Sequence, residues 1–229
     1  MRWSSCRFFF GFSLGIALLS AGSGLPAQTA SPTRFVVVID AAHGGDDTGG
    51  HLDDGQLEKN ATLALSIRLR SQLTARGFDV VTTRDGDTSR TPVERAEIAN
   101  HVRAQACISL HVAESGFGVH MFTSSLAPAP ATTFLPWKTA QSAWITRSVA
   151  LAGALNSALS QAGVNVTLGS TSLPGIDSMT CPAVAIELAP ERDKGNKITA
   201  QPDNPDYQAR IASMLATGLL EWRAEGRRP

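Results

Sequence analysis

The sequence predicts an α/β domain with a mostly parallel central sheet and helices on both faces. Residues 35–40 are a continuous apolar run that ends in an acid, and this absence of alternation is typical of a strand buried on both faces. Segments with helical periodicity alternate with further short apolar runs along the chain. The length of 229 residues with 43% hydrophobic content suits one domain with a sizeable core.

The first half of the chain alternates strand and helix signals. After the strand at 35–40, residues 57–76 carry leucine or alanine at intervals of four and are followed by a glycine, which predicts an amphipathic helix. Residues 91–102 open with Thr-Pro-Val-Glu, a capping pattern with proline at the first helical position. Further strands are expected at 78–83, 106–111 and 118–123.

The second half contains one long irregular segment among regular elements. Residues 126–138 include three prolines and predict a long loop. A helix is expected at 139–161, and a Gly/Ser/Thr-rich connection leads to an apolar strand at 182–188. The last helix, at about 205–223, has its apolar residues on one stripe.

The N-terminus has the pattern of a secretory signal peptide. Two arginines precede the 12-residue apolar run 8–19, and small residues follow. A membrane-spanning helix needs about 20 apolar residues, so an uncleaved anchor is disfavoured. We expect a signal peptide at residues 1–30 with cleavage near 27–30, a catalytic domain at 31–229 with no stable membrane span, and export to the periplasm or cell envelope.

Charge and cysteine content narrow the classes of partner. Twenty basic and twenty acidic residues cancel, so no net positive field is present to bind nucleic acid. After cleavage two cysteines are left, Cys107 and Cys181. Export permits a disulfide between them, but two buried thiols would give the same sequence pattern.

Three polar side chains point to a metal site. His43 follows the first strand and precedes two glycines, His111 ends another strand, and Glu58 opens the helix after the His43 loop. The carboxyl ends of parallel strands meet at one edge of a sheet, where ligands usually bind. Two histidines and a glutamate are a three-ligand zinc set that leaves one tetrahedral position open for water. The predicted cofactor is therefore Zn²⁺.

A fourth group predicts hydrolysis. Within the strand expected at 182–188, Glu187 ends the apolar run 183–186, where a carboxylate is costly unless it is paired, capping or at an active edge. Beside zinc it is the expected general base for amide or ester hydrolysis. Each residue also has a structural explanation. Glu58 suits a helix N-terminus, an effect under about 1 kcal/mol. His111 suits a hydrogen-bonded core, and Glu187 suits pairing with Arg192 or Lys194.

The other polar residues near these motifs are given smaller roles. His51 lies in a polar segment and is expected to be exposed, although it is close enough in sequence to reach a metal near Glu58. His101 and His120 are interpreted as structural. Asp46 and Asp47 are interpreted as turn residues, with contact to the first ligand histidine as the alternative.

Four motifs in order carry a family resemblance: Val-Ile-Asp with His-Gly-Gly at residues 38–45, Glu-Lys-Asn at 58–60, Ile-Ser-Leu-His at 108–111 and Pro-Ala-Val-Ala-Ile-Glu-Leu at 182–188. The chain resembles zinc-dependent N-acetylmuramoyl-L-alanine amidases of the cell-separation type from about residue 34 to 223. The resemblance implies zinc on the positions already identified as ligands and a catalytic glutamate at 187. It also implies peptidoglycan or muropeptides as substrate, cleaved between muramic acid and L-alanine.

The chain departs from the family pattern at several places. Ala41-Ala42 replaces Pro-Gly, and if that glycine needs positive φ an alanine there is strained. Residues 112–114 and 189–190 also differ, and residues 124–138 have no clear family counterpart. The leading hypothesis is an exported zinc amidase, with an activator protein as a possible partner. The alternatives are a catalytically impaired peptidoglycan-binding or regulatory protein on the same scaffold, and a zinc hydrolase of a different exported amide.

Overall fold

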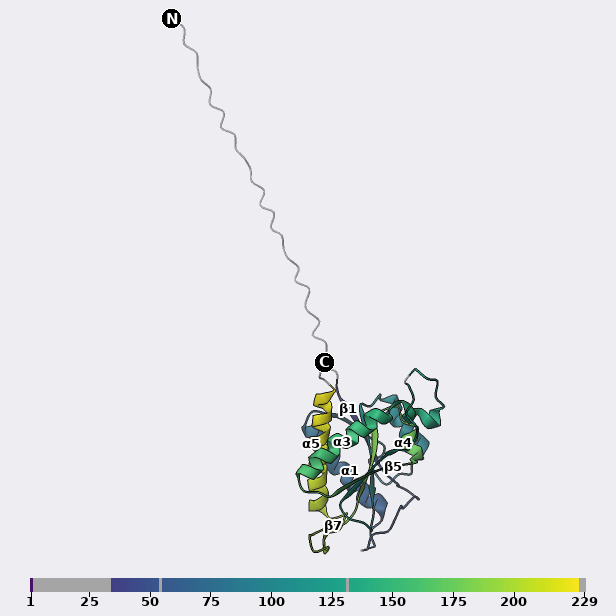
Figure 1. Cartoon of the computed structure of the whole chain (residues 1–229), viewed down its shortest axis with the longest axis vertical. Helices are drawn as coiled ribbons and strands as arrows, with labels where there is room; N and C mark the ends of the chain where they lie inside the picture. Colours follow the sequence, from purple (N-terminus) through teal and green to yellow (C-terminus); the bar gives the residue numbers. More distant parts are fainter. Residues whose placement is uncertain (2–33, 54, 131, 227–229) are drawn as a thin grey trace. The chain divides into compact units, whose positions relative to one another are not determined.

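A six-stranded sheet in the order β2-β1-β3-β6-β4-β5 forms the centre of the computed structural model (Figure 1). The structure describes Met1 and residues 34–226 except 54 and 131, so the predicted signal peptide lies outside the described residues apart from Met1. The strands are β1 (Val36–Ala41), β2 (Asp79–Thr82), β3 (Ala106–Val112), β4 (Val119–Ser124), β5 (Val166–Thr171) and β6 (Ala183–Leu188). A separate two-stranded sheet pairs β7 (Glu191–Arg192) with β8 (Ile198–Ala200).

The direction of β4 divides the sheet into two parts. Strands β2, β1, β3 and β6 are parallel, whereas β4 is antiparallel to β6 and β5 is parallel to β4. The predicted mostly parallel sheet is therefore confirmed. Because β4 is antiparallel to β6, its first residues lie at the carboxyl ends of β2, β1, β3 and β6, and its last residue, Ser124, lies at the edge where those four strands begin.

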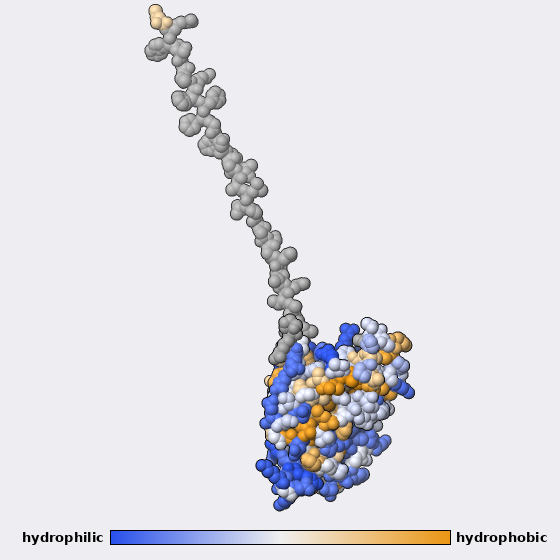
Figure 2. Space-filling model, in the orientation of Figure 1, coloured by the Kyte–Doolittle hydropathy of each residue, from blue (hydrophilic) through white to orange (hydrophobic). Residues whose placement is uncertain are grey.

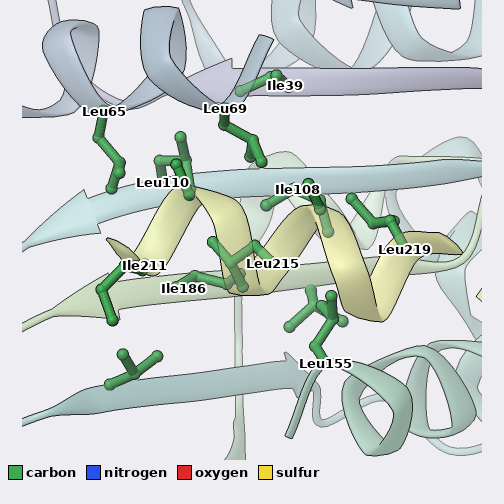
Figure 3. Packing of buried hydrophobic residues seen from close by; sticks show 14 of the residues in the cluster. Ile39, Leu65, Leu69, Ile108, Leu110, Leu155, Ile186, Ile211, Leu215 and Leu219 are labelled. Atoms are coloured by element: carbon green, nitrogen blue, oxygen red, sulfur yellow. The ribbon is translucent and has the colours of Figure 1, made fainter. Parts of the chain in front are cut away.

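The two faces of the sheet are covered unequally. Alternate strand residues pack against α1 (Glu58–Ala75), α3 (Ile145–Gln161) and α5 (Pro205–Glu225), and Figure 3 shows leucines of these helices against isoleucines of the sheet. The opposite face carries smaller side chains and is covered by α2 (Pro92–His101) and α4 (Pro174–Asp177). Helices on both faces confirm the predicted layer arrangement, and the thinner layer leaves room for a site.

The predicted helix ends agree with the structure where local signals are strong. Thr91 forms the capping box of α2: its hydroxyl accepts from the backbone N–H of Glu94, whose carboxylate accepts from the N–H of Thr91. The helix expected at 139–161 differs. A 3-10 helix, η1 (Trp137–Ala143), precedes α3, because the buried Gln141 side chain binds the carbonyls of Met179 and Cys181. These tertiary bonds outweigh helix propensity.

The connection expected between 163 and 182 contains β5 and α4, which the sequence analysis missed. β5 is an exposed edge strand of Val-Thr-Leu-Gly-Ser-Thr and lacks the apolar pattern of a buried strand. Cys107 and Cys181 form a disulfide, which resolves the alternative left open by the sequence. No helix in the described part of the chain is long and apolar enough to span a bilayer.

The Pro-rich segment leaves the sheet at the edge where β1 and β3 begin, opposite the carboxyl ends of these strands. It begins after Ser124, and its described residues between 125 and 136 form no helix or strand, as predicted. The last two residues of the expected loop, 137 and 138, belong instead to η1. Phe134 and Trp137 are exposed there, at 97% and 54%. Figure 2 shows other apolar side chains mixed with polar ones over the face that carries α3.

Candidate metal centre

The three predicted ligands converge at the carboxyl edge of the sheet. His43 lies two residues beyond β1, Glu58 is the first residue of α1, and His111 is next to last in β3. Their ligand atoms all lie within 4.8 Å of one another. The Glu58 carboxylate is between the two rings, with Oε2 3.1 Å from Nε2 of His43 and Oε1 3.2 Å from Nδ1 of His111.

The turn that carries His43 has a left-handed backbone. His43 itself has φ of 62°, and the next two residues, Gly44 and Gly45, have φ of 127° and 61°. A Cβ on Gly44 would lie 2.4 Å from the carbonyl oxygen of Thr88, so glycine is required there. Ala42 does not have a positive φ, so the alanine that replaces the family's glycine is not strained. The strained residue of the turn is His43 instead.

Two buried arginines hold this strained turn in place. Arg95 donates from Nη1 to the carbonyl of Ala41 at 2.7 Å and from Nη2 to that of His43 at 2.8 Å. Arg84 donates from Nη2 to the carbonyl of Ala42 at 3.0 Å. Three consecutive carbonyl oxygens are therefore bound by guanidinium groups, whose fork geometry suits such contacts. Sequence analysis did not identify either arginine as part of the site.

Glu58 is more than a charge at a helix N-terminus. It is 7% exposed, and its two oxygens accept backbone N–H bonds from Gly50 at 2.9 Å and Val112 at 3.2 Å. Burial alone would raise the pKa of Glu58, but hydrogen bonds from His111 and His43 outweigh it and hold the pKa well below its ordinary value. The Glu58 hydrogen bond in turn raises the pKa of His43.

This donor set fits a zinc ion. Two imidazole nitrogens and one carboxylate oxygen are the ligands of many open catalytic zinc sites. Asp47 Oδ1 lies 2.9 Å from Nδ1 of His43 and accepts its N–H, which directs Nε2 toward the other ligands. Such a carboxylate partner is typical of metal-binding histidines. The contact considered for Asp47 is thus present, whereas Asp46 is exposed at the surface.

Glu187 lies on the next strand, in register with His111 and on the same face of the sheet. It pairs with neither Arg192 nor Lys194. Arg192 donates instead to the carbonyls of residues 116 and 196, and Lys194 is exposed. The partner of Glu187 is His120 on β4, with 2.9 Å between Oε1 and Nδ1. Sequence analysis interpreted His120 as structural and missed this contact.

The other two histidines are separate from the ligand cluster. His51 is exposed and forms an isolated backbone bridge with Leu57, and His101 is exposed at the end of α2. Within the described residues, the metal-binding cluster comprises the three predicted ligands alone.

A cleft of about 230 Å³ opens beside the ligands on the thinly covered face of the sheet. Its floor includes Asp40, which accepts from Nη1 of Arg95 at 2.7 Å and from the hydroxyl of Ser109 at 2.8 Å. One wall is formed by residues 173–176 around α4, and His43 and His111 line the end nearest the ligands. The cleft therefore opens directly onto His43 and His111 of the ligand cluster.

The fold and the site together define an α/β protein with a two-histidine, one-glutamate cluster able to hold a metal ion at the carboxyl edge of its sheet. A family model described as N-acetylmuramoyl-L-alanine amidase matches residues 37–221. The chain therefore belongs to the N-acetylmuramoyl-L-alanine amidase family, and the family resemblance of its motifs is confirmed.

Individual relatives agree with this assignment. The amidase AmiA of Escherichia coli is 39% identical over 92 residues, which cover 40% of this chain and 32% of AmiA. The amidase Rv3717 of Mycobacterium tuberculosis is 26% identical over 90% of this chain and 92% of its own length. The catalytic domain of the amidase CwlV from Paenibacillus polymyxa has a similar structure, with a TM-score of 0.64, 26% identity, and coverage of 83% of this chain and 98% of that domain. The match to AmiA thus spans about a third of that protein.

Proposed function

We propose that this chain is an exported, zinc-dependent N-acetylmuramoyl-L-alanine amidase that cleaves the amide between muramic acid and L-alanine in peptidoglycan. The observation that carries the proposal is the convergence of His43, Glu58 and His111 beside Glu187 in a chain of this family. The two histidines and Glu58 are the proposed zinc ligands, and Glu187 is the proposed catalytic residue.

The residues of the chain divide the work of hydrolysis. When bound, zinc supplies a Lewis acid that polarises the amide carbonyl and acidifies water. Glu187 accepts a proton from the attacking water and delivers it to the amide nitrogen, so that the C–N bond breaks to give a lactyl carboxylate and a free L-alanine amine. The carboxylate of Glu187 is available for this role because its side chain is 36% exposed at the sheet edge.

Export and domain limits are part of the proposal. The disulfide between Cys107 and Cys181 supports an oxidising compartment such as the periplasm. We place the signal peptide at residues 1–30 and the catalytic domain at 31–229. Peptidoglycan or muropeptides are the proposed partners, and an activator protein is a further possible one.

The test is hydrolysis of purified peptidoglycan by residues 31–229 with added zinc or with a chelator, followed by mass spectrometry. The expected products are stem peptides that begin with free L-alanine, formed only with zinc. Glu187→Gln is expected to keep zinc and lose activity. If the unmodified protein retains muropeptides but neither binds zinc nor releases product, the binding-protein alternative is correct. Products cut at another amide would establish the alternative of a zinc hydrolase with a different amide substrate.

A further inference from the structure

The histidine beside the proposed catalytic carboxylate belongs to a different strand from the metal ligands. In the sheet, Glu187 lies between His111 of β3 on one side and His120 of β4 on the other, and both are its register partners. His111 belongs to the metal cluster, and His120 does not. The described part of the site therefore contains one histidine with no role in binding the metal, in contact with the carboxylate proposed to transfer the proton.

The hydrogen bond between His120 and Glu187 has a defined donor and acceptor. An ionised carboxylate only accepts hydrogen bonds, so the 2.9 Å contact requires a proton on Nδ1 of His120 that is donated to Oε1 of Glu187. One carboxylate oxygen is then occupied and the second is left for water. A carboxylate free to rotate would present either oxygen in many orientations, whereas this hydrogen bond holds the Glu187 carboxylate in one orientation.

The ring of His120 is itself confined. Gly116, in the loop before β4, has φ of 85°, and a Cβ built on it would lie 2.7 Å from Cε1 of the imidazole. The loop backbone thus packs directly on the ring, which is 21% exposed. A polar contact of this exposure contributes little to stability, so packing and pairing alone give a weak reason for a histidine here.

We propose that His120 is a positioning residue that orients Glu187 for proton transfer. This inference rests on the proposed amidase function. Partners that orient active-site groups in this way typically change activity by about 10- to 100-fold when removed. Their loss affects the chemical step more than substrate binding, because the substrate does not contact them.

The experiment compares two variants of similar shape, His120→Asn and His120→Leu. The amide N–H₂ of asparagine can replace the Nδ1–H donor, and leucine cannot. We expect His120→Leu to lower kcat by about 10- to 100-fold with KM changed less than about twofold and zinc content unchanged, and His120→Asn to restore most of kcat. The control is His101→Leu, at the exposed end of α2, which should match the unmodified protein.

Each other outcome overturns a definite statement. If His120→Leu keeps full kcat, or if His120→Asn is as slow as His120→Leu, the positioning role is wrong while the amidase proposal stands. If the unmodified chain hydrolyses no muropeptide, the amidase proposal fails and the inference fails with it.

A second measurement requires neither enzymatic activity nor a substitution at position 120. In ¹⁵N-labelled protein, Glu187→Gln should shift the imidazole resonances of His120, while Glu97→Gln on the exposed face of α2 should not. Unchanged resonances in Glu187→Gln would overturn the inference even if His120→Leu proved unstable.

Discussion

The parallel part of the sheet and the β4–β5 part differ in how tightly their residues are held. In β3 every residue except His111 is buried, whereas in β5 only Val166 is even partly buried. The proposed metal ligands come from β3 and from the loop and helix that follow β1. Glu187 lies where the two parts meet, because β6 pairs with both β3 and β4. The proposed metal site thus depends on one part of the sheet, and the proposed orientation of Glu187 depends on the other.

The largest expected effect is on the ligand cluster. Glu58→Ala removes a ligand that is also bound by two backbone N–H groups, so zinc binding and hydrolysis should both fall to background. Zinc content after dialysis and product release measure the two. Glu97→Ala, an exposed acid on α2, is the matched control and should lose neither. Full zinc content in Glu58→Ala would show that the ligand assignment is wrong.

Glu187→Gln separates the two parts of the site. It removes the proton acceptor without touching a proposed ligand, so zinc should be retained while kcat falls by about 10²- to 10⁴-fold, the usual contribution of general acid–base catalysis. Steady-state kinetics and metal analysis on one sample test this. Loss of zinc together with activity would mean that Glu187 acts on the metal side of the site.

The buried charges under the His43 turn should dominate stability. Arg95→Met leaves Asp40 buried without its cation and frees two turn carbonyls, and breaking such a pair costs about 3–5 kcal/mol. Urea unfolding measures the free energy. Arg90→Met, on an exposed residue that lines the same cleft, should change it by less than about 0.5 kcal/mol. Similar losses of unfolding free energy in the two variants would contradict the role of Arg95 in holding the His43 turn.

The disulfide is the next device that holds the parallel part together. It joins Cys107 of β3 to Cys181, two residues before β6 begins, across 74 positions. Replacing both Cys107 and Cys181 with alanine should lower the free energy of unfolding by about 2–4 kcal/mol, mainly because the unfolded chain is released from its cross-link. A reducing agent should have the same effect on the unmodified protein and none on the double variant.

The same division explains what could be predicted from sequence. Buried parallel strands give continuous apolar runs and α1 gives a helical repeat of leucines, and both signals are strong. The carboxyl ends of the parallel strands then bring His43, His111 and Glu187 to one edge of the sheet. β5 has no such signal because its side chains face solvent. The contact of His120 with Glu187 depends on β4 being antiparallel to β6 in one register, which no local pattern in the strand specifies.

The role of the two buried arginines could not be predicted for a similar reason. Arg84 and Arg95 come from the loop after β2 and from α2, and their role is clear only when the carbonyls of residues 41–43 are seen beside them. Buried arginines are rare, but burial of a residue in the first turns of a helix cannot be read from composition. Local sequence therefore identified the ligands and not the groups that hold them.

The smallest expected effect sharpens the contrast between the two parts. Leu168 of β5 is 53% exposed and Leu110 of β3 is fully buried. Leu110→Ala should cost about 2–5 kcal/mol through lost burial and a cavity, whereas Leu168→Ala should cost less than about 0.5 kcal/mol. Urea unfolding of both variants tests this directly. A large loss in Leu168→Ala would mean that β5 is covered in solution, and the two parts of the sheet would then no longer differ in how firmly they are held.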